Sequence, residues 1–236
     1  MQFDFKNILF IDIETVPAQA SYEQLDEVTQ ALWAEKVAYL TADGEHGPAD
    51  LYERAGVMAE FGKIICISAG YFRWQDGDRT FRVKSFYSHS EREILTAFGT
   101  LLGEKFPHFT LCAHNGKEFD FPFTARRMLI NGIPLPGPLQ IAGKKPWEVA
   151  HLDTMEMWKF GDRKNFTSLK LLAHLFGIPT PKDDISGKDV ARVYWVDDDL
   201  ERIAVYCQKD VVALANLCLR WDQKEILSDD EIVYLP

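Results

Sequence analysis

The sequence predicts a single α/β domain in which helices cover a mixed sheet. The chain has 236 residues, of which 47% are hydrophobic, and a chain of this size can bury one large core. Strand patterns dominate its first half and helical spacing dominates its second half. A crossover helix is also expected between two of the strands. We therefore assign residues 1–236 to one domain.

Five segments have the patterns of strands. Residues 7–13 form a nearly continuous apolar run rich in isoleucine, which is typical of a strand buried on both faces. The second and third strands flank a turn at residues 76–78 and are expected to form an antiparallel hairpin. The expected strands are residues 7–13, 63–72, 80–87, 109–113 and 148–152.

Helical spacing of apolar residues accounts for most of the remaining chain. Residues 18–61 separate the first two strands by more than a hairpin requires, so we expect a helical insertion there. Ser90 is expected to be an N-cap, with Glu93 in the capping-box position. The expected helices are residues 21–40, 51–59, 90–103, 119–130, 168–176, 187–194 and 198–221.

Composition and charge argue against several classes of protein. The formal net charge of −10 argues against a protein that coats nucleic acid by bulk electrostatics, but it is compatible with an enzyme that grips a short end. No apolar stretch approaches the length of a membrane span, and the charged N-terminus does not resemble a signal peptide. The cysteines lie in apolar runs without a CxxC pair, which favours buried thiols in a reducing, cytoplasmic setting. They are Cys66, Cys112, Cys207 and Cys218.

Two carboxylates lie two residues apart at the end of the first strand. Side chains at this spacing point to the same face of a strand, so Asp12 and Glu14 project together from its carboxyl end. Buried charges need partners, and divalent cations would be suitable ones. Taken alone, the pair is equally well explained by two carboxylates that face water where the strand ends.

Two further motifs follow the fourth strand and lie on the last helix. Asn115 and Asp120 are expected at a helix entrance, where the positive end of the helix dipole suits an anionic metal ligand or a phosphate. An N-cap role for Asn115 and core packing for Phe119 are the alternatives. Tyr206 and Asp210 are four residues apart and share one face of the last helix, where a surface position is the alternative.

Together, the three motifs resemble those of the DEDD exonucleases, the superfamily of DnaQ-like exonucleases and polymerase proofreading domains. The spacing of the last motif matches the tyrosine branch, DEDDy. Residues 152–154, 168–172 and 176–179 are similar to stand-alone relatives of the family B DNA polymerase proofreading domain. The resemblance covers residue 10 to about residue 217 and implies a ribonuclease H-like fold with a mixed five-stranded sheet. The motifs are Asp12-x-Glu14, Asn115-x-x-x-Phe119-Asp120 and Tyr206-x-x-x-Asp210.

The resemblance implies a role for each motif residue. Two divalent cations, Mg²⁺ or Mn²⁺, would be held by four carboxylates. Asp12 would bridge both ions. Glu14 and Asp210 would complete the ion that activates water, and Asp120 would support the ion at the leaving 3′ oxygen. Tyr206 would orient the attacking water. The residues in contact with the terminal nucleotides would be Thr15, Asn115 and Phe119.

The implied reaction is hydrolysis of phosphodiester bonds at single-stranded 3′ ends, with release of nucleoside 5′-monophosphates. DNA is the expected substrate. An exoribonuclease is the main alternative, because the sequence offers no secure reader of the 2′-hydroxyl. A catalytically inactive nucleic-acid-binding module is the alternative from another class, but such a module would be free to lose carboxylates that are all present here. No membrane association is expected, and a protein partner in trans stays open.

Overall fold

The fold is a six-stranded mixed sheet with helices on both faces. The computed structural model describes residues 1–41, 44–162, 166–179 and 185–236. Its strands are β1 Ile8–Pro17, β2 Gly62–Gln75, β3 Asp78–Tyr87, β4 Thr110–Ala113, β5 Leu152–Asp153 and β6 Ile232–Leu235. They are arranged in the order β5-β4-β1-β2-β3-β6. β2 is antiparallel to β1 and to β3, whereas the remaining pairs are parallel. The expected mixed α/β class is confirmed, and the order of the first five strands is that of a ribonuclease H-like sheet.

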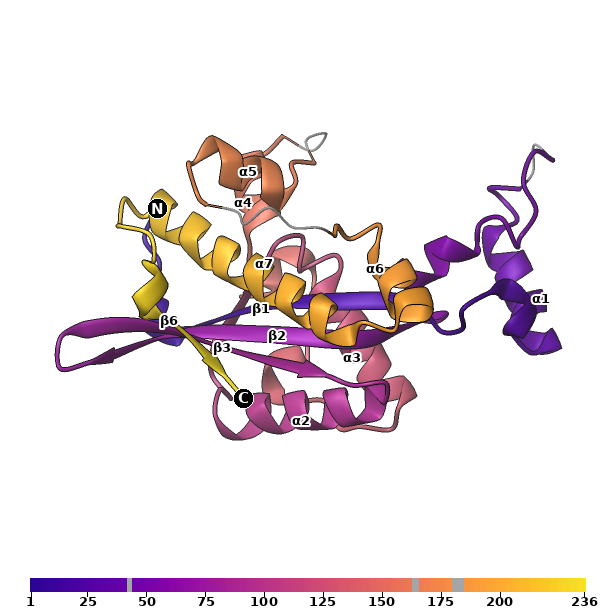
Figure 1. The fold of residues 1–236 in the computed structure, drawn as a ribbon, viewed down its shortest axis with the longest axis horizontal. Helices are drawn as coiled ribbons and strands as arrows, with labels where there is room; N and C mark the ends of the chain where they lie inside the picture. The colour runs from indigo at the N-terminus through magenta and orange to yellow at the C-terminus, as the bar shows by residue number, and fades with distance from the viewer. Residues whose placement is uncertain (42–43, 163–165, 180–184) are drawn as a thin grey trace.

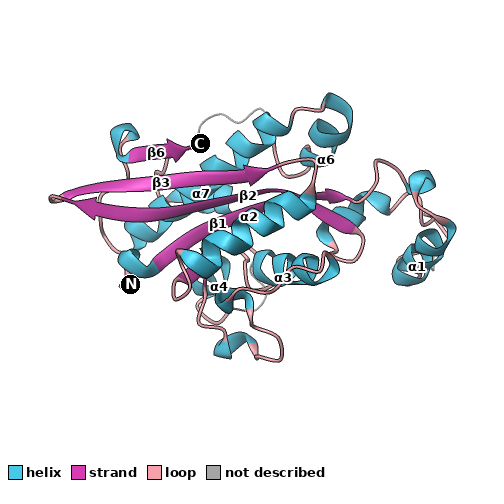
Figure 2. Cartoon of the chain, turned by 90° about the horizontal axis from the view of Figure 1, so that it is seen from below, coloured by secondary structure: helices cyan, strands magenta, loops and turns pink. Residues whose placement is uncertain are grey.

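Helices form a layer on each face of the sheet. They are α1 Glu27–Val37, α2 Glu91–Glu104, α3 Asp120–Ile130, α4 Thr154–Lys159, α5 Leu169–Leu175, α6 Val190–Arg192 and α7 Leu200–Trp221. The long helix α7 lies along one face, and α2 and α3 lie against the other (Figures 1 and 2). No helix among the described residues combines the length and apolarity needed to cross a bilayer.

The side chains of β1 alternate between these two layers, as the pleat of a strand requires. Leu9 and Ile11 are fully buried in the core that β1 shares with α2 and α3. Ile8 and Phe10 are buried in the core on the α7 side. The apolar run at the start of the sequence is therefore buried on both faces, as expected. Each second residue after Phe10 is directed towards α7.

Apart from shifts of one to three residues at other strand ends, the strands differ from the expectations in three places. β1 continues to Pro17 because its antiparallel pairing with β2 extends that far. The fifth strand, expected at residues 148–152, consists of Leu152–Asp153, because a 3-10 turn occupies Pro146–Glu148. β6 was not expected, so the sheet has six strands rather than five.

The strand β6 is held in place by contacts that are remote in sequence. It pairs in parallel with β3. Immediately before it, the Glu231 carboxylate accepts hydrogen bonds from Arg79 Nε and a terminal guanidinium nitrogen, at 2.7 and 2.9 Å. This ion pair lowers the pKa of Glu231 to about 2. The four residues of β6 carry too short a pattern to show a strand without this long-range contact.

Residues 18–61 carry α1, which lies at one end of the molecule beyond the sheet (Figure 1). The segment has a small core of its own, built by Trp33, Val37, Tyr52 and Ala55. Trp33 is fully buried, and its indole N–H donates to the carbonyl oxygen of Pro48 at 2.7 Å. The helices expected at residues 21–40 and 51–59 correspond to α1 and to a 3-10 segment at 52–57.

The start of α2 is stabilised differently from the expectation. Ser90 is the N-cap, but its side chain makes no capping hydrogen bond. The Glu93 carboxylate accepts instead from the Ser88 hydroxyl at 2.8 Å, so the expected capping box is absent. The first residue of the helix, Glu91, is buried and paired with Arg127 of α3. This ion pair joins α2 to α3.

Candidate active site

Asp12 and Glu14 lie on β1 just beyond the end of its parallel neighbour. The pairing of β4 with β1 stops at Phe10, whereas β2 stays paired on the other side. The two carboxylates therefore lie within the strand and not at its carboxyl end, which corrects the expectation. The β1–β2 register shifts immediately after Glu14. Both side chains face α7, since an oxygen of each lies within 4.8 Å of the other and of Cys207 Sγ on that helix.

The third carboxylate, Asp120, comes from the first residue of α3. It is only 3% exposed. Its carboxylate lies near the backbone N–H of Ile13, the residue between Asp12 and Glu14, and this N–H acts to lower its pKa. The approach is possible because β4 has already left the edge of β1 at that point. The second motif is thereby tied to the first, although more than 100 residues separate them in sequence.

The fourth carboxylate, Asp210, lies on α7 one turn after Tyr206. The two side chains lie close together, as their shared helix face predicts, and the Asp210 carboxylate contributes to a raised pKa of the Tyr206 phenol. The Asp210 carboxylate is also close enough to raise the pKa of both Asp12 and Glu14 by electrostatic repulsion. The tertiary structure thus brings together the acidic residues of all three motifs and the tyrosine.

Burial and mutual repulsion disfavour the charged forms of these carboxylates. Burial, followed by the neighbouring carboxylates, raises the pKa of Asp12 and of Glu14 well above the usual range. Burial also raises the pKa of Asp120 to about 7, with a further contribution from Asp153. Without bound cations, nothing offsets the free-energy cost of keeping these carboxylates charged. Bound divalent cations would remove it, and an oxygen-rich ligand set suits Mg²⁺ or Mn²⁺.

Cys207 is a member of this cluster that sequence reasoning missed. It was interpreted only as a small buried hydrophobe, and it is indeed fully buried. Its Sγ, however, donates to the carbonyl oxygen of Asp12 at 3.4 Å and to Asp12 Oδ2 at 3.3 Å. Burial raises the pKa of the thiol, so that the protonated donor form is favoured. Its position directly after Tyr206 was the available sequence signal.

Asn115 occupies the left-handed region, with φ of 67°. Its N–H donates to Asp153 Oδ1 at 3.0 Å, and the N–H of Lys117 donates to Asp153 Oδ2 at 3.0 Å. The N-cap of α3 is Phe119, so the N-cap alternative for Asn115 is wrong. Asp153 itself is the N-cap of α4. It therefore connects the loop of the second motif to the start of α4.

Thr15 and Phe119 have less direct relations to the cluster. Thr15 is half-buried and follows the register shift in β1. The ring of Phe119 packs against the core formed with α2 and α3 and lies 5.2 Å from the ring of Phe123. The packing role considered for Phe119 is thus present. His114, next to the motif, contacts Thr154 Oγ1 at 2.9 Å and the carbonyl oxygen of Thr167 at 2.8 Å, which holds the loop in place.

Replacing Asp153 by asparagine is expected to lower the free energy of unfolding by about 1–3 kcal/mol, because an amide nitrogen would then face the N–H of Lys117 with no acceptor. Urea denaturation measures this change. The matched control is Asp26→Asn, since Asp26 is an exposed N-cap that accepts from Thr29 N at 2.9 Å, and asparagine caps about as well as aspartate there. Equal midpoints for the two variants would contradict the connecting role of Asp153.

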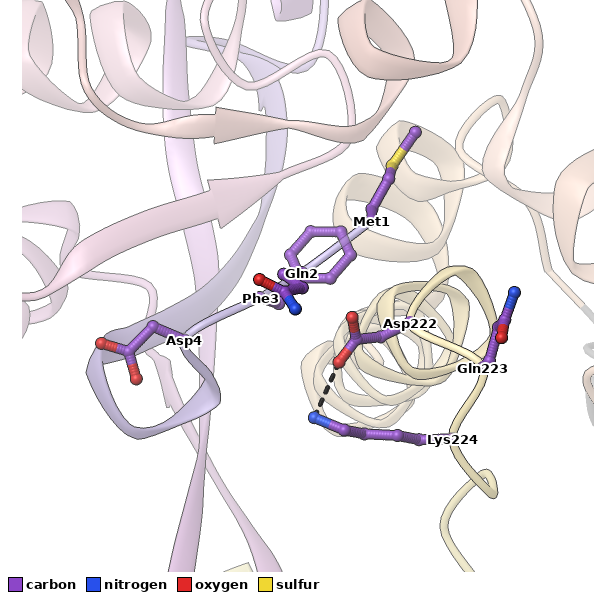
Figure 3. A pocket seen from close by; sticks show the side chains of 7 residues that line it. All are labelled: Met1, Gln2, Phe3, Asp4, Asp222, Gln223 and Lys224. Carbon is purple, nitrogen blue, oxygen red and sulfur yellow. Dashed lines mark ion pairs between the residues drawn. The ribbon is translucent and has the colours of Figure 1, made fainter.

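Three cavities are lined by residues of the motifs, and a fourth lies elsewhere. Tyr206 lines one of ≈ 330 Å³, Asp210 lines one of ≈ 290 Å³, and Asn115 with Asp153 line one of ≈ 680 Å³. Another, of ≈ 750 Å³, lies where the N-terminus meets the end of α7 and includes an Asp222–Lys224 ion pair of 2.7 Å (Figure 3). None of the motif residues lines this last cavity, so we do not assign the chemistry to it. Its lining residues are Met1, Gln2, Phe3, Asp4, Asp222, Gln223 and Lys224.

Comparison with known proteins relates the chain to DNA polymerases. A DNA polymerase from Pyrococcus glycovorans is 27% identical over 134 residues, which cover 51% of this chain and 17% of that protein. The structure of the family B DNA polymerase from the hyperthermophilic archaeon Pyrobaculum calidifontis aligns with 90% of this chain and 24% of that chain, at 14% identity and a TM-score of 0.49. The chain therefore spans about a quarter or less of the length of either polymerase.

A family model covers most of the chain. It matches residues 57–228 and describes a predicted 3′-5′ exonuclease related to the exonuclease domain of PolB. The match includes the second and third motifs, Asp153 and the whole of α7. Because it covers more than half of the 236 residues, the chain belongs to the family of predicted 3′-5′ exonucleases related to the exonuclease domain of PolB.

Proposed function

We propose that this protein is a metal-dependent 3′→5′ exonuclease that removes nucleoside 5′-monophosphates from single-stranded DNA ends. The observation that carries the proposal is the meeting of four carboxylates and one tyrosine from β1, α3 and α7 in one cluster, whose members are buried or half-buried. Such a set is costly to bury without cations, and membership of the exonuclease family supplies a use for them. RNA ends are the alternative substrate.

The carboxylates are the proposed metal ligands. Asp12, Glu14, Asp120 and Asp210 would hold two divalent cations, Mg²⁺ or Mn²⁺. Bound cations supply an activated water and cover the charge that develops on the leaving oxygen. The protein's own contribution is to fix the ligands. The thiol of Cys207 orients Asp12, and the N–H of Ile13 lies near Asp120 and favours its charged form.

Tyr206 is the proposed residue that orients the attacking water. Burial and the neighbouring carboxylates, first among them Asp210, raise the pKa of the phenol well above its usual value. The phenol therefore stays protonated near neutral pH, so it can donate or accept a hydrogen bond but cannot serve as a phenolate base. Its position one helical turn before Asp210 keeps the hydroxyl near the carboxylates.

The terminal nucleotides are expected to lie against the loop of the second motif. Asn115 borders the ≈ 680 Å³ cavity beside the cluster, and Asp153 holds its backbone in the left-handed conformation. Thr15, at the register shift of β1, and Phe119, at the start of α3, are the other proposed contacts. Aromatic contact with a base tolerates any sequence, which suits an enzyme that trims ends.

The test is hydrolysis of 5′-labelled single-stranded DNA and RNA of matched sequence, each with Mg²⁺, with Mn²⁺ and with EDTA. We expect a metal-dependent ladder that shortens from the 3′ end. The ladder should be lost in Asp210→Asn and kept in Glu104→Gln, which removes an exposed carboxylate at the far end of α2. A full ladder from Asp210→Asn, or no ladder from folded wild-type protein with either metal, would overturn the proposal.

A further inference from the structure

A groove of ≈ 680 Å³ lies beside the carboxylate cluster and is not explained by the proposed chemistry. Its walls come from the loop of the second motif, the segment before β5, and the end of α4. A volume of this order accommodates one or two nucleotides. Asn115 and Asp153 form its end next to the cluster, because Asp153 is close enough to raise the pKa of Asp120.

Three lysines line this groove, and two of them form no salt bridge within the part of the chain that the structure describes. Lys117 is paired with Glu156 at 2.8 Å. Within residues 1–41, 44–162, 166–179 and 185–236, no salt bridge engages Lys144 or Lys159. Unpaired ammonium groups beside a concave surface attract phosphate, and each phosphate contact releases counterions. We refer to this cavity, with Lys144, Lys159 and Phe166 as its defining residues, as the lysine groove.

Four carboxylates also border the lysine groove. The carboxylate of Asp153 accepts four backbone N–H groups, and that of Glu156 is paired with Lys117. With three lysines and four carboxylates along its walls, the groove has a formal charge of −1 in a protein of net charge −10. The four carboxylates are those of Glu118, Asp153, Glu156 and Asp162.

Exposed aromatic rings accompany these lysines. Phe166 lines the lysine groove and is 69% exposed, with Lys159 Nζ 4.5 Å from its ring centre. Trp147 is 76% exposed, and Lys145 Nζ lies 5.3 Å from its ring centre. Aromatic rings held in water beside lysines are the features with which proteins bind single-stranded nucleic acid.

The backbone at the rim of the lysine groove supports the same conclusion. Phe160 lies between two groove residues, Lys159 and Gly161, and has φ of 44°. A bulky residue rarely adopts this left-handed conformation, which is strained. The ring is 77% exposed, so burial in the core does not compensate for the strain. The strained turn instead keeps an aromatic ring at the surface next to Lys159.

We propose that the lysine groove binds the single strand on the 5′ side of the terminal nucleotide, which rests on the exonuclease function proposed above. Lys144 and Lys159 contact backbone phosphates, and a base stacks on Phe166. The strand then passes Asn115 and presents its 3′ end to the carboxylate cluster. This arrangement selects substrates that are single-stranded over several nucleotides, because a stacked base has to be unpaired.

The test compares substrates that reach the lysine groove with substrates that do not. The variant is Lys144→Ala/Lys159→Ala/Phe166→Ala. Its matched control, Lys36→Ala/Lys105→Ala/Tyr39→Ala, removes the same charge and one exposed aromatic ring at sites outside the groove. KM and kcat are measured for a dinucleotide and for a 12-nucleotide strand, as DNA and as RNA. Binding of the 12-nucleotide strand is measured separately by fluorescence anisotropy in EDTA, where hydrolysis cannot occur.

For the lysine-groove variant, we expect KM for the 12-nucleotide strand to rise about 10-fold or more, because the variant loses the stacking of one base and two phosphate contacts. The kcat of this variant for the 12-nucleotide strand, and its KM and kcat for the dinucleotide, should match those of the wild type. In the anisotropy measurement, the slope of log K against log salt should become shallower by about 1.4, which corresponds to two phosphate contacts on a single strand.

The two proposals fail in different ways. Equal KM values and equal salt slopes for the wild type and the lysine-groove variant on the 12-nucleotide strand would overturn the groove proposal alone. An equal rise in KM for the control variant would overturn it too, since the effect would then be one of net charge. Absence of hydrolysis of either substrate by the wild type would overturn the exonuclease function, and the anisotropy measurement would still decide whether the groove binds a single strand.

Discussion

Replacing Asp12 by asparagine is expected to lower kcat/KM about 10³-fold or more and, without divalent ions, to stabilise the protein. The loss of activity follows because the proposed bridging ligand would lose its charge while the other ligands stayed in place. The gain in stability follows because Asp12 is buried among like charges that raise its pKa. An asparagine oxygen would still accept the hydrogen bond from Cys207.

The effect on stability depends on pH with a defined sign. Burial and repulsion raise the pKa of Asp12, Glu14 and Asp120 in the folded protein, that of Asp120 to about 7. The unfolded chain releases these protons near pH 4, so it holds fewer protons than the folded protein between about pH 4 and pH 7. The free energy of unfolding of the metal-free protein should therefore fall as the pH rises through this window.

Urea denaturation in EDTA at pH 5 and pH 8 tests this expectation. At pH 8, the metal-free Asp12→Asn protein should be more stable than the wild type by about 1–3 kcal/mol, and the difference should be smaller at pH 5. Added Mg²⁺ or Mn²⁺ should stabilise the wild type more than the variant. Glu104→Gln, at an exposed position, is the control. Destabilisation of the metal-free Asp12→Asn protein at pH 8 would contradict the description of the cluster as electrostatically strained.

The second large effect is expected at the buried ion pair that joins α2, α3 and the sheet. Glu91 Oε1 accepts from the N–H of Ile64 at 2.7 Å and from Arg127 Nε at 2.8 Å. Glu91 Oε2 accepts from Arg127 Nη2 at 2.5 Å and from Asn131 Nδ2 at 2.9 Å. Arg127 also donates to the carbonyl oxygen of Ala59 at 2.9 Å. All four contacts to the carboxylate come from donors, so a carboxylate is required at this position.

Glu91→Gln is expected to lower the free energy of unfolding by about 3–5 kcal/mol, because it leaves the charge of Arg127 buried without a counterion and points an amide nitrogen at other donors. The midpoint of urea denaturation measures the loss, provided that the m-value is unchanged. Glu93→Gln on the same helix is the matched control, and its exposed position should keep the change within about 0.5 kcal/mol. Similar midpoints for the two variants would show that the ion pair contributes little.

Some parts of the fold and the site could be predicted because they depend on local periodicity. The isoleucine-rich run of β1 shows burial on both faces, and its alternation places Asp12 and Glu14 on one side. The hairpin between β2 and β3 follows from the turn at Asp76–Gly77, where both residues have positive φ. The spacing of Tyr206 and Asp210 places them on one face of α7. In each case, the deciding residues are within five positions of one another.

Other features depend on contacts that sequence periodicity does not record. Sequence periodicity does not show that Arg127 packs against Glu91, which is 36 residues away. The length of β1 is decided by β2, and β6 is held by Arg79 and Glu231. Each of these features depends on which distant segment of the chain packs beside it in the folded protein.

The sequence by itself determined the mixed α/β class, the order of the motifs and the residues that carry them. Only the tertiary structure decided how the motifs meet. The early end of β4 leaves the N–H of Ile13 for Asp120, and α7 crosses the sheet where Asp12 faces it. The contact of the Cys207 thiol with Asp12 follows from the crossing of α7. The four hydrogen bonds to Asp153 follow from the position of the second-motif loop beside the start of α4. The physical reason is that local patterns specify faces and turns, whereas the packing of distant elements specifies which polar groups become partners.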